Sequence, residues 1–191
     1  MAESGISRKY EEYAFVLDYL PHGRPSLAQR MYRTAGVVQL LGELYFTLLE
    51  AALRENTTVA LGERLYIGRD PRYKIAYIIG RVDYKDLTSS AQTELPIVLE
   101  KAVKAQEKRF IAFFNGAQAL TPRMHALELL PGVGKRYMWI ILGQREKKPF
   151  TSFEELKQRT GIHEPVKLVG RRILEELSEE EPKYRIFTRG P

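Results

Sequence analysis

The residues of this chain whose types and spacing best suit chemistry with a ligand form one short segment. Two glycines, Gly132 and Gly134, flank the apolar Val133, and two cations, Lys135 and Arg136, follow directly. Glycine permits a tight turn and a close backbone approach. A helix that begins near the second glycine presents free N–H groups and a positive dipole end, which attract phosphate. The pattern therefore predicts a phosphate contact at this turn.

The same Gly-x-Gly segment also fits a turn that binds nothing, and it has to be distinguished from a Walker-type phosphate loop. A Pro-Gly pair between two helices is also a common turn that binds nothing, and this alternative stays open. The tighter Gly-x-Gly pattern with two bases resembles the helix-hairpin-helix motif, a nucleic-acid-binding element that does not read sequence, and we favour that interpretation. A Walker-type phosphate loop is excluded, because Lys135 is followed by Arg136 and not by Ser or Thr.

The distribution of charge supports a polyanionic partner. The chain of 191 residues has a formal net charge of +6, which by itself favours nucleic acid only mildly. Residues 123–148 carry six basic and two acidic side chains, so the positive excess gathers around the turn. We expect Arg123, Lys147 and Lys148 to join Lys135 and Arg136 in contacting nucleic acid.

Two loops in the first half of the chain are further candidates for nucleic-acid contact. His22 and Arg24 lie in a stiff Pro-His-Gly-Arg-Pro loop, and Arg69, Arg72 and Lys74 form a second cationic loop. Arginine suits phosphate and also stacks on bases, and barrels that bind oligonucleotides use such loops. A structural turn with solvated cations is an equally good interpretation, and both remain open.

The elements that position these loops read as β structure in the first half. Runs rich in aromatic and branched residues predict strands at 13–20, 59–67 and 75–82. The apolar run 37–49 fits a strand, or a helix leading into one. Four or five short strands between Gly and Pro turns predict a small barrel over residues 10–87, which we expect to be OB-like. With the helical second half, the fold class is α+β.

The second half reads as helix. We expect a connecting helix over 88–115, kinked or restarted at Pro96, whose phenylalanines are core. A helix-hairpin-helix domain follows over 116–180, with a helix that begins at Thr121 and a degenerate second hairpin. Residues 183–188 predict a short strand that returns to the barrel edge. Trp139, the only tryptophan, is expected to pack between barrel and helices.

No signature of catalysis is recognised. The three histidines lie in different segments without ligand spacing, and there is no cysteine. We therefore expect no metal, no cofactor and no enzymatic activity, although a processing enzyme with scattered carboxylates stays a weaker alternative. No apolar run is long enough to cross a membrane, and the N-terminus does not resemble a signal peptide. The expected location is cytoplasmic.

Several blocks of the sequence together resemble one family. The chain resembles the uncharacterised archaeal family known as domain of unknown function 655, and the likeness runs from about Tyr10 to Phe187. This resemblance implies a β N-terminal domain, a helix-hairpin-helix C-terminal domain and an RNA-binding protein whose genes neighbour those of transcription and ribosome maturation. The blocks that carry the likeness are 10–13, 18–25, 42–50, 84–88, 127–135, 149–150 and 152–154.

Two functional hypotheses of different classes follow. The first is a non-enzymatic protein that binds nucleic acid, RNA favoured over DNA, through backbone phosphates; engaging about four phosphates would give a salt slope of roughly −3 to −4. The second is an adaptor for proteins of a ribosome or transcription assembly, with a structural hairpin and a binding surface on the barrel edge or the helix 97–114.

Overall fold

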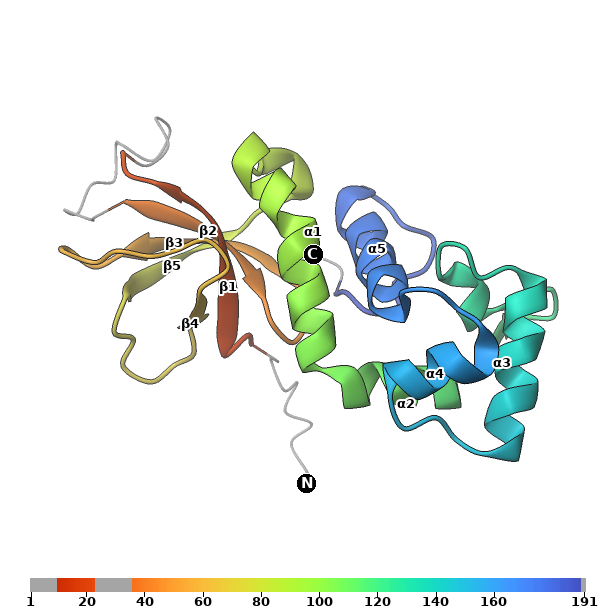
Figure 1. Cartoon of the computed structure of the whole chain (residues 1–191). Coiled ribbons are helices and arrows are strands. Elements are labelled where there is room, and N and C mark those ends of the chain that lie inside the picture. Colours follow the sequence, from red (N-terminus) through yellow and green to blue (C-terminus); the bar gives the residue numbers. More distant parts are fainter. Residues whose placement is uncertain (1–9, 23–35, 190–191) are drawn as a thin grey trace, which may run out of the picture. The chain divides into compact units, whose positions relative to one another are not determined.

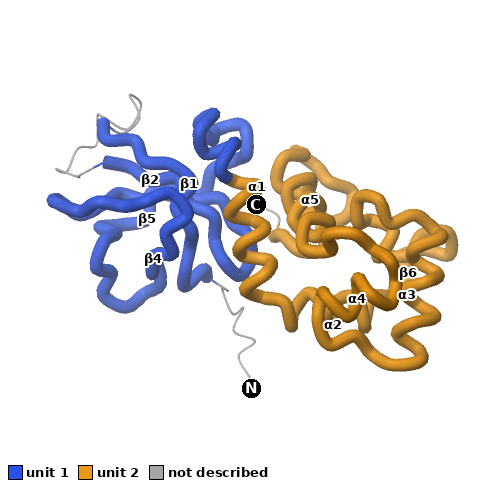
Figure 2. The backbone as a smooth tube through the Cα atoms, in the orientation of Figure 1, with its two compact units in different colours: residues 1–94, 191 blue, residues 95–190 orange. Residues whose placement is uncertain are grey.

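The computed structural model describes residues 10–22 and 36–189 of the chain (Figure 1). The chain forms two compact units, one of residues 1–94 with residue 191 and the other of residues 95–190 (Figure 2). The division falls inside helix α1 (Ser89–Ala105), so that this helix begins in one unit and ends in the other. The sequence placed it in a connecting helix over 88–115.

The first unit is built on one curled antiparallel sheet with the strand order β4-β1-β2-β3-β5. Because β4 and β5 lie at opposite edges of this order, the sheet is a half-barrel and not a closed barrel. The mixed α+β class is confirmed. The strands are β1 (Tyr13–Leu20), β2 (Val37–Gly42), β3 (Leu48–Leu53), β4 (Arg64–Tyr66) and β5 (Ile75–Arg81).

The burial of strands β2 and β3 explains why the apolar run 37–49 fits either a strand or a helix by sequence. Every residue of β2 and of β3 is buried, so neither strand shows the alternation that identifies a half-exposed strand. The turn between them is held from outside by the buried Glu11, whose carboxylate accepts from the amides of Leu44 and Tyr45, both at 2.9 Å. A long-range carboxylate therefore ends β2 where the local sequence gives no clear stop.

The second unit is helical apart from one short hairpin. None of the helices within residues 10–22 and 36–189 combines the length and apolarity needed to cross a bilayer. The elements of the second unit are the end of α1, α2 (Glu107–Gly116), β6 (Ala119–Thr121), β7 (Met124–His125), the 3₁₀ helix η3 (Ala126–Leu129), α3 (Lys135–Lys147), α4 (Phe153–Thr160) and α5 (Pro165–Ser178). One more 3₁₀ helix, η2 (Tyr84–Asp86), precedes α1 in the first unit.

The helices in this half depart from the sequence prediction at two places. The helix does not restart at Pro96, which lies inside α1, and the break between α1 and α2 falls at Gln106. The helix expected from Thr121 does not form, because Thr121 ends strand β6 and only η3 follows before the turn. His125 starts η3 by accepting a hydrogen bond from the Leu127 amide at 3.1 Å, so the capping signal lies four residues later than predicted.

The last two helices follow their sequence signals closely. Ser152 Oγ accepts from the Glu155 amide at 3.1 Å and caps α4, as the Ser-x-x-Glu spacing predicts. Gly161 ends α4 in the left-handed conformation with φ +73°, and Pro165 occupies the first position of α5. These two helices therefore start and stop where local chemistry alone places them.

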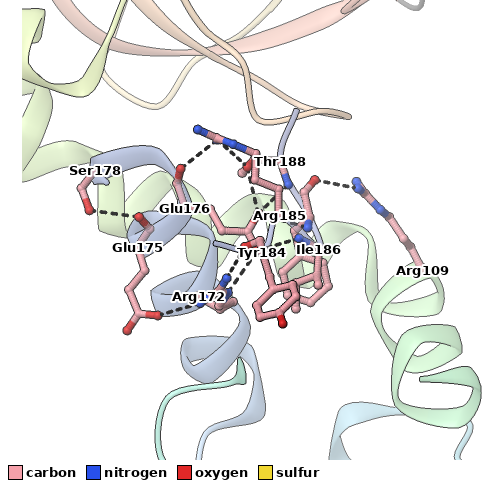
Figure 3. Close-up of polar contacts among 10 residues, drawn as sticks. Arg109, Arg172, Glu175, Glu176, Ser178, Tyr184, Arg185, Ile186 and Thr188 are labelled. Carbon is pink, nitrogen blue, oxygen red and sulfur yellow. Dashed lines mark hydrogen bonds and ion pairs between the residues drawn. The ribbon is translucent and has the colours of Figure 1, made fainter. Parts of the chain in front are cut away.

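The C-terminal segment is a latch and not the strand that the sequence predicts. Residues 184–188 form no strand and bend at 186–188, where the fully buried carboxylate of Glu176 on α5 holds them (Figure 3). Glu176 accepts from the amides of Ile186 at 2.9 Å and Thr188 at 2.9 Å, while Arg172 Nε donates to it at 3.1 Å. Phe187 packs edge-to-face on Phe110 with ring centroids 5.3 Å apart. A buried acid thus satisfies the backbone donors that a sheet would otherwise pair.

Candidate nucleic-acid interface

The Gly-Val-Gly turn is anchored by its middle residue. The Val133 amide donates to the Leu130 carbonyl at 2.9 Å, and the Val133 side chain is only 2% exposed. Leu127 and Met138, on either side of the turn, are buried as well. Val133 was predicted to contact nucleic acid, but its amide is bonded within the turn and its side chain is buried in the core of the helical unit.

The two glycines of the turn have different reasons to be glycine. Gly132 has φ +84°, a conformation that residues with a Cβ rarely adopt, so the backbone requires glycine there. Gly134 has φ −81°, and a Cβ added to it would meet nothing within 4 Å. Neither backbone conformation nor internal crowding requires glycine at position 134. Its exposed surface leaves room for a group from outside the chain to approach the backbone.

The start of α3 concentrates positive charge. Gly134 is the N-cap without a side-chain cap, and the first α-helical bond runs from the Met138 amide to the Gly134 carbonyl at 3.0 Å. The first turn contains no acidic residue, and Lys135 and Arg136 are exposed there. Neither cation forms an ion pair within the described residues. Two cations at the positive end of a helix are unfavourable by themselves, whereas an anion placed there would be stabilised.

The turn is braced by a reciprocal cap at the preceding 3₁₀ helix. Glu128 accepts from the His125 amide at 2.8 Å, while His125 Nδ1 accepts from the Leu127 amide. Burial, and then the positive charge of Arg145, lower the pKa of His125 below its ordinary 6.5, against the opposing effect of Glu128. The imidazole therefore stays neutral, which leaves Nδ1 able to accept.

The structure separates Lys147 and Lys148 from the turn. Both lie at the far end of α3, roughly 18 Å from Lys135 by the rise of a helix. Lys148 forms an ion pair with Glu155 at 3.5 Å, which offsets its charge. Hydrogen bonds from the hydroxyl and amide of Thr151, followed by Arg159 and Lys148, lower the pKa of Glu155 to about 2. Of the two lysines at this end of the helix, Lys148 is thus part of a structural junction, whereas Lys147 forms no ion pair within the described residues.

Arg123 is exposed in the tight turn between β6 and β7. Its amide donates to Thr121 Oγ1 at 3.3 Å, which shapes the turn. The guanidinium forms no ion pair within residues 10–22 and 36–189. Arg123 therefore remains a candidate phosphate contact of the helical unit, presented by a short hairpin and not by the helix that the sequence predicts.

Two of the cations expected to act from the half-barrel, Arg72 and Lys74, form hydrogen bonds inside it. Arg72 Nε donates to the carbonyls of Ile67 and Gly68 at 3.1 and 2.7 Å, which shapes its own loop. Lys74 Nζ pairs with Glu63 at 2.6 Å, and this hydrogen bond lowers the pKa of Glu63 even though burial acts to raise it. The charge of Lys74 is thus offset by Glu63, and Arg72 is held in its own loop through Nε.

Two other cationic positions of this unit remain exposed. Arg69 stacks on the Tyr10 ring at 4.6 Å from its centroid, so its guanidinium lies against an aromatic face. His22 is exposed in the turn that follows β1. Arg24, the other candidate of that loop, lies outside the described residues.

Trp139 is the residue that the sequence interpretation placed wrongly. It was expected to pack in an interface, yet it is 66% exposed on α3. Its position, one helical turn after Lys135 and Arg136, is the signal that could have found it, because residues i, i+3 and i+4 share a helix face. Tryptophan is usually well buried, and this general tendency outweighed the spacing.

A metal centre is not formed by the described residues. No three His, Asp or Glu side chains within residues 10–22 and 36–189 come together in a way that could hold an ion. The three histidines stand apart in the sequence, and His125 uses Nδ1 as a helix cap.

Together these features define an α+β protein with a curled five-stranded sheet in one unit and a cationic helix-start in a second, helical unit. The model of a family described as a protein of unknown function (DUF655) matches residues 10–189, and the chain belongs to this family. An uncharacterized protein of Methanocaldococcus jannaschii, MJ0038, is 43% identical over 183 residues, which span 95% of this chain and 82% of that protein.

A solved structure shares this fold. The crystal structure of Af1531 from Archaeoglobus fulgidus, of the same family, aligns with a TM-score of 0.84 and 43% identity. The alignment covers 94% of this chain and 100% of that one. The family membership implied by the sequence blocks is therefore confirmed.

Proposed function

We propose that this protein is a non-enzymatic nucleic-acid-binding protein, with RNA favoured, that contacts backbone phosphates at the start of α3. One observation carries the proposal. Lys135 and Arg136 lie exposed in the first turn of α3, beside the glycine at position 134, whose missing side chain leaves open space. In this proposal the segment acts as a helix-hairpin-helix element, with η3 standing in for its first helix.

The electrostatics of α3 favour an external anion over a purely structural turn. A helix start is normally stabilised by acidic residues or a capping side chain, and α3 has neither. A phosphate at this position accepts hydrogen bonds from the amides of the first turn and neutralises the two cations. Such contacts read the backbone and not the bases, so sequence preference is expected to be weak.

The sheet contributes less to this function than the loop composition predicted. Arg72 and Lys74 are tied to internal acceptors, which leaves Arg69 and His22 as its exposed candidates among the described residues. In our proposal the half-barrel is OB-like and holds a neighbouring strand through these side chains. A location in the cytoplasm and a role in ribosome maturation or transcription complete the proposal.

Binding of single-stranded and duplex RNA and DNA at several salt concentrations tests the proposal. The three cations of the helical unit, Lys135, Arg136 and Arg123, by themselves give an expected slope of log K against log salt of roughly −2 to −3. This range is shallower than the sequence interpretation gave, because Lys148, Arg72 and Lys74 are engaged internally. Binding that is absent, or that does not change with salt, would contradict the proposal.

A second candidate function is that of an adaptor for another protein. The observation in its favour is the edge strand β5, where Tyr77 is 41% exposed, with Tyr73 just before it at 90%. A strand from a partner can pair with such an edge. The helix 97–114 does not offer a comparable aromatic surface, since Phe110 and Phe114 are fully buried. Capture of a partner that survives high salt and nuclease, and is lost on Tyr77→Lys, would favour this function.

A further inference from the structure

We infer that Trp139 is a stacking platform for one unpaired nucleobase, next to the phosphate contact at the start of α3. This inference rests on the proposed function and makes it specific, because it assigns the polymer to single strands or to strands with unpaired bases. The bases of a continuous duplex are stacked on one another, and their faces are closed to a side chain. An indole face can therefore take a base only where pairing and stacking are interrupted.

The first argument is the exposure of the indole. Trp139 is 66% exposed, whereas tryptophan is highly buried on average in folded proteins. Its ring forms no aromatic or cation–π contact within the described part of the chain. The aromatic rings of Phe110 and Phe187, by contrast, lie 5.3 Å apart in the interior of the same unit. Trp139 thus contributes little to the core.

The second argument is what surrounds the indole on the helix face. Side chains on a helix lean toward its N-terminus, so Trp139 lies over the turn that carries Lys135 and Arg136. On its other side, one turn later, Gly143 is exposed, and a Cβ added there would meet nothing within 4 Å. The ring is therefore bordered by two cations and by an open position.

Charge complementarity selects the occupant of this face. The exposed charged residues one turn before Trp139 are Lys135 and Arg136, and the acid nearest its face, Glu146, lies two turns after it. A flat apolar ring among cations matches a nucleotide, which joins a flat base to a phosphate. Stacking accepts every base, because all have a π-face, in agreement with contacts that do not read sequence. An apolar protein partner would leave these cations desolvated and unpaired.

Trp139 is the only tryptophan, so its fluorescence reports directly on this site. Intrinsic emission and affinity are measured for the full chain with one RNA sequence, as a single strand and as a long duplex with few ends. The single strand is expected to quench the emission to saturation, and the duplex to leave it unchanged. Trp139→Ala should weaken single-strand binding roughly 5- to 100-fold and leave duplex binding unchanged, while Trp139→Phe should retain most of the affinity.

Tyr73→Ala is the matched control, because it removes the most exposed large aromatic side chain among the described residues of the other unit, at 90% exposure. It should leave affinity and quenching unchanged. If both polymers bind with a salt-dependent affinity, yet emission and Trp139→Ala affinity do not change, the stacking inference is wrong and the proposed function stands. If no polymer binds, the proposed function is wrong as well. Circular dichroism confirms that each variant is folded.

Discussion

Val133 and Leu130 are joined by a hydrogen bond of 2.9 Å from the amide of the first to the carbonyl of the second. This bond closes the turn before α3 and removes the central amide of the Gly-Val-Gly segment from any ligand contact. The Val133 side chain, 2% exposed, fixes the turn to the helical core. The ligand-facing part of the turn is therefore the second glycine and the two cations that follow it.

Val133→Ala should destabilise the protein by about 1–3 kcal/mol, because it removes buried methyl groups and leaves a cavity under the turn. Urea unfolding at an unchanged m-value measures the loss. Lys135→Ala is the comparison, since Lys135 is exposed and its truncation should change the free energy of unfolding by less than about 0.5 kcal/mol. A Val133→Ala variant as stable as the wild type would contradict the anchoring role.

The two glycines of the turn should respond in opposite ways to alanine. Gly132→Ala forces an alanine to φ +84° and should cost about 1–2 kcal/mol of stability. Gly134→Ala meets no internal atom within 4 Å and should cost less, about 0.5–1 kcal/mol for the poorer N-cap, yet it should weaken RNA binding, because a methyl group then stands where the phosphate approaches. Thermal unfolding and a binding titration separate the two effects. Unchanged RNA affinity in folded Gly134→Ala would exclude close backbone contact at this position.

Acid should loosen the turn through His125. Burial and the charge of Arg145 lower the pKa of His125 in the folded state, so below pH 6.5 the unfolded chain binds more protons than the folded one. The contribution of this cap is complete above 6.5 and is lost as the pH falls through the lower folded pKa. Protonation also removes the acceptor at Nδ1 that holds the Leu127 amide.

His125→Asn provides the control, because asparagine caps a helix start without titrating in this range. As the pH falls from about 7.5 to about 5.5, the wild type should lose more of its unfolding free energy than His125→Asn does. A difference that does not depend on pH would show that the imidazole is not held neutral.

The latch of Figure 3 should depend on Glu176 far more than on its neighbour. Glu176→Gln removes the charge that faces Arg172 at 3.1 Å in the interior and should cost about 3–5 kcal/mol. Glu175→Gln also removes a partner of Arg172, at 3.4 Å, but Glu175 is 44% exposed, and the loss should stay below about 1 kcal/mol. Chemical denaturation of the two variants measures the contrast. Equal losses would contradict the burial argument.

Local chemistry explains which parts of the fold could be predicted. Strand β1 was predicted over its full length from its aromatic and branched residues, and α4 from the cap at Ser152 and the glycine at 161. Residues 184–188 look like a strand by composition, but Glu176, 10 to 12 residues away, accepts hydrogen bonds from the amides of Ile186, Phe187 and Thr188. Strand β1 and helix α4 depend on neighbours in the sequence, whereas the conformation of residues 184–188 depends on a distant contact that no local pattern reveals.

The candidate site shows the same division. The exposed cations after Gly134 follow directly from the sequence pattern. The ion pair of Lys74 with Glu63 depends on how two segments of the chain meet, and the hydrogen bonds of Arg72 to two carbonyls depend on how its own loop bends. The prediction that Trp139 is buried followed the average burial of tryptophan, whereas its spacing from Lys135 and Arg136 on the helix indicates its exposed position. Counting cations in a sequence thus overestimates those that can meet a phosphate.

The most direct test of phosphate binding at the start of α3 is the double variant Lys135→Glu/Arg136→Glu, measured for both stability and RNA affinity. Acidic side chains stabilise a helix when they lie at its positive N-terminal end, so the variant should be about 0.5–2 kcal/mol more stable than the wild type. Its RNA affinity should fall strongly, and the magnitude of the salt slope should drop by about 2. The control, Lys104→Glu/Lys108→Glu, makes the same change in net charge at two exposed positions on other helices. Greater stability together with lost RNA binding is the predicted result, whereas RNA binding equal to that of the control variant would contradict a phosphate site at this helix start.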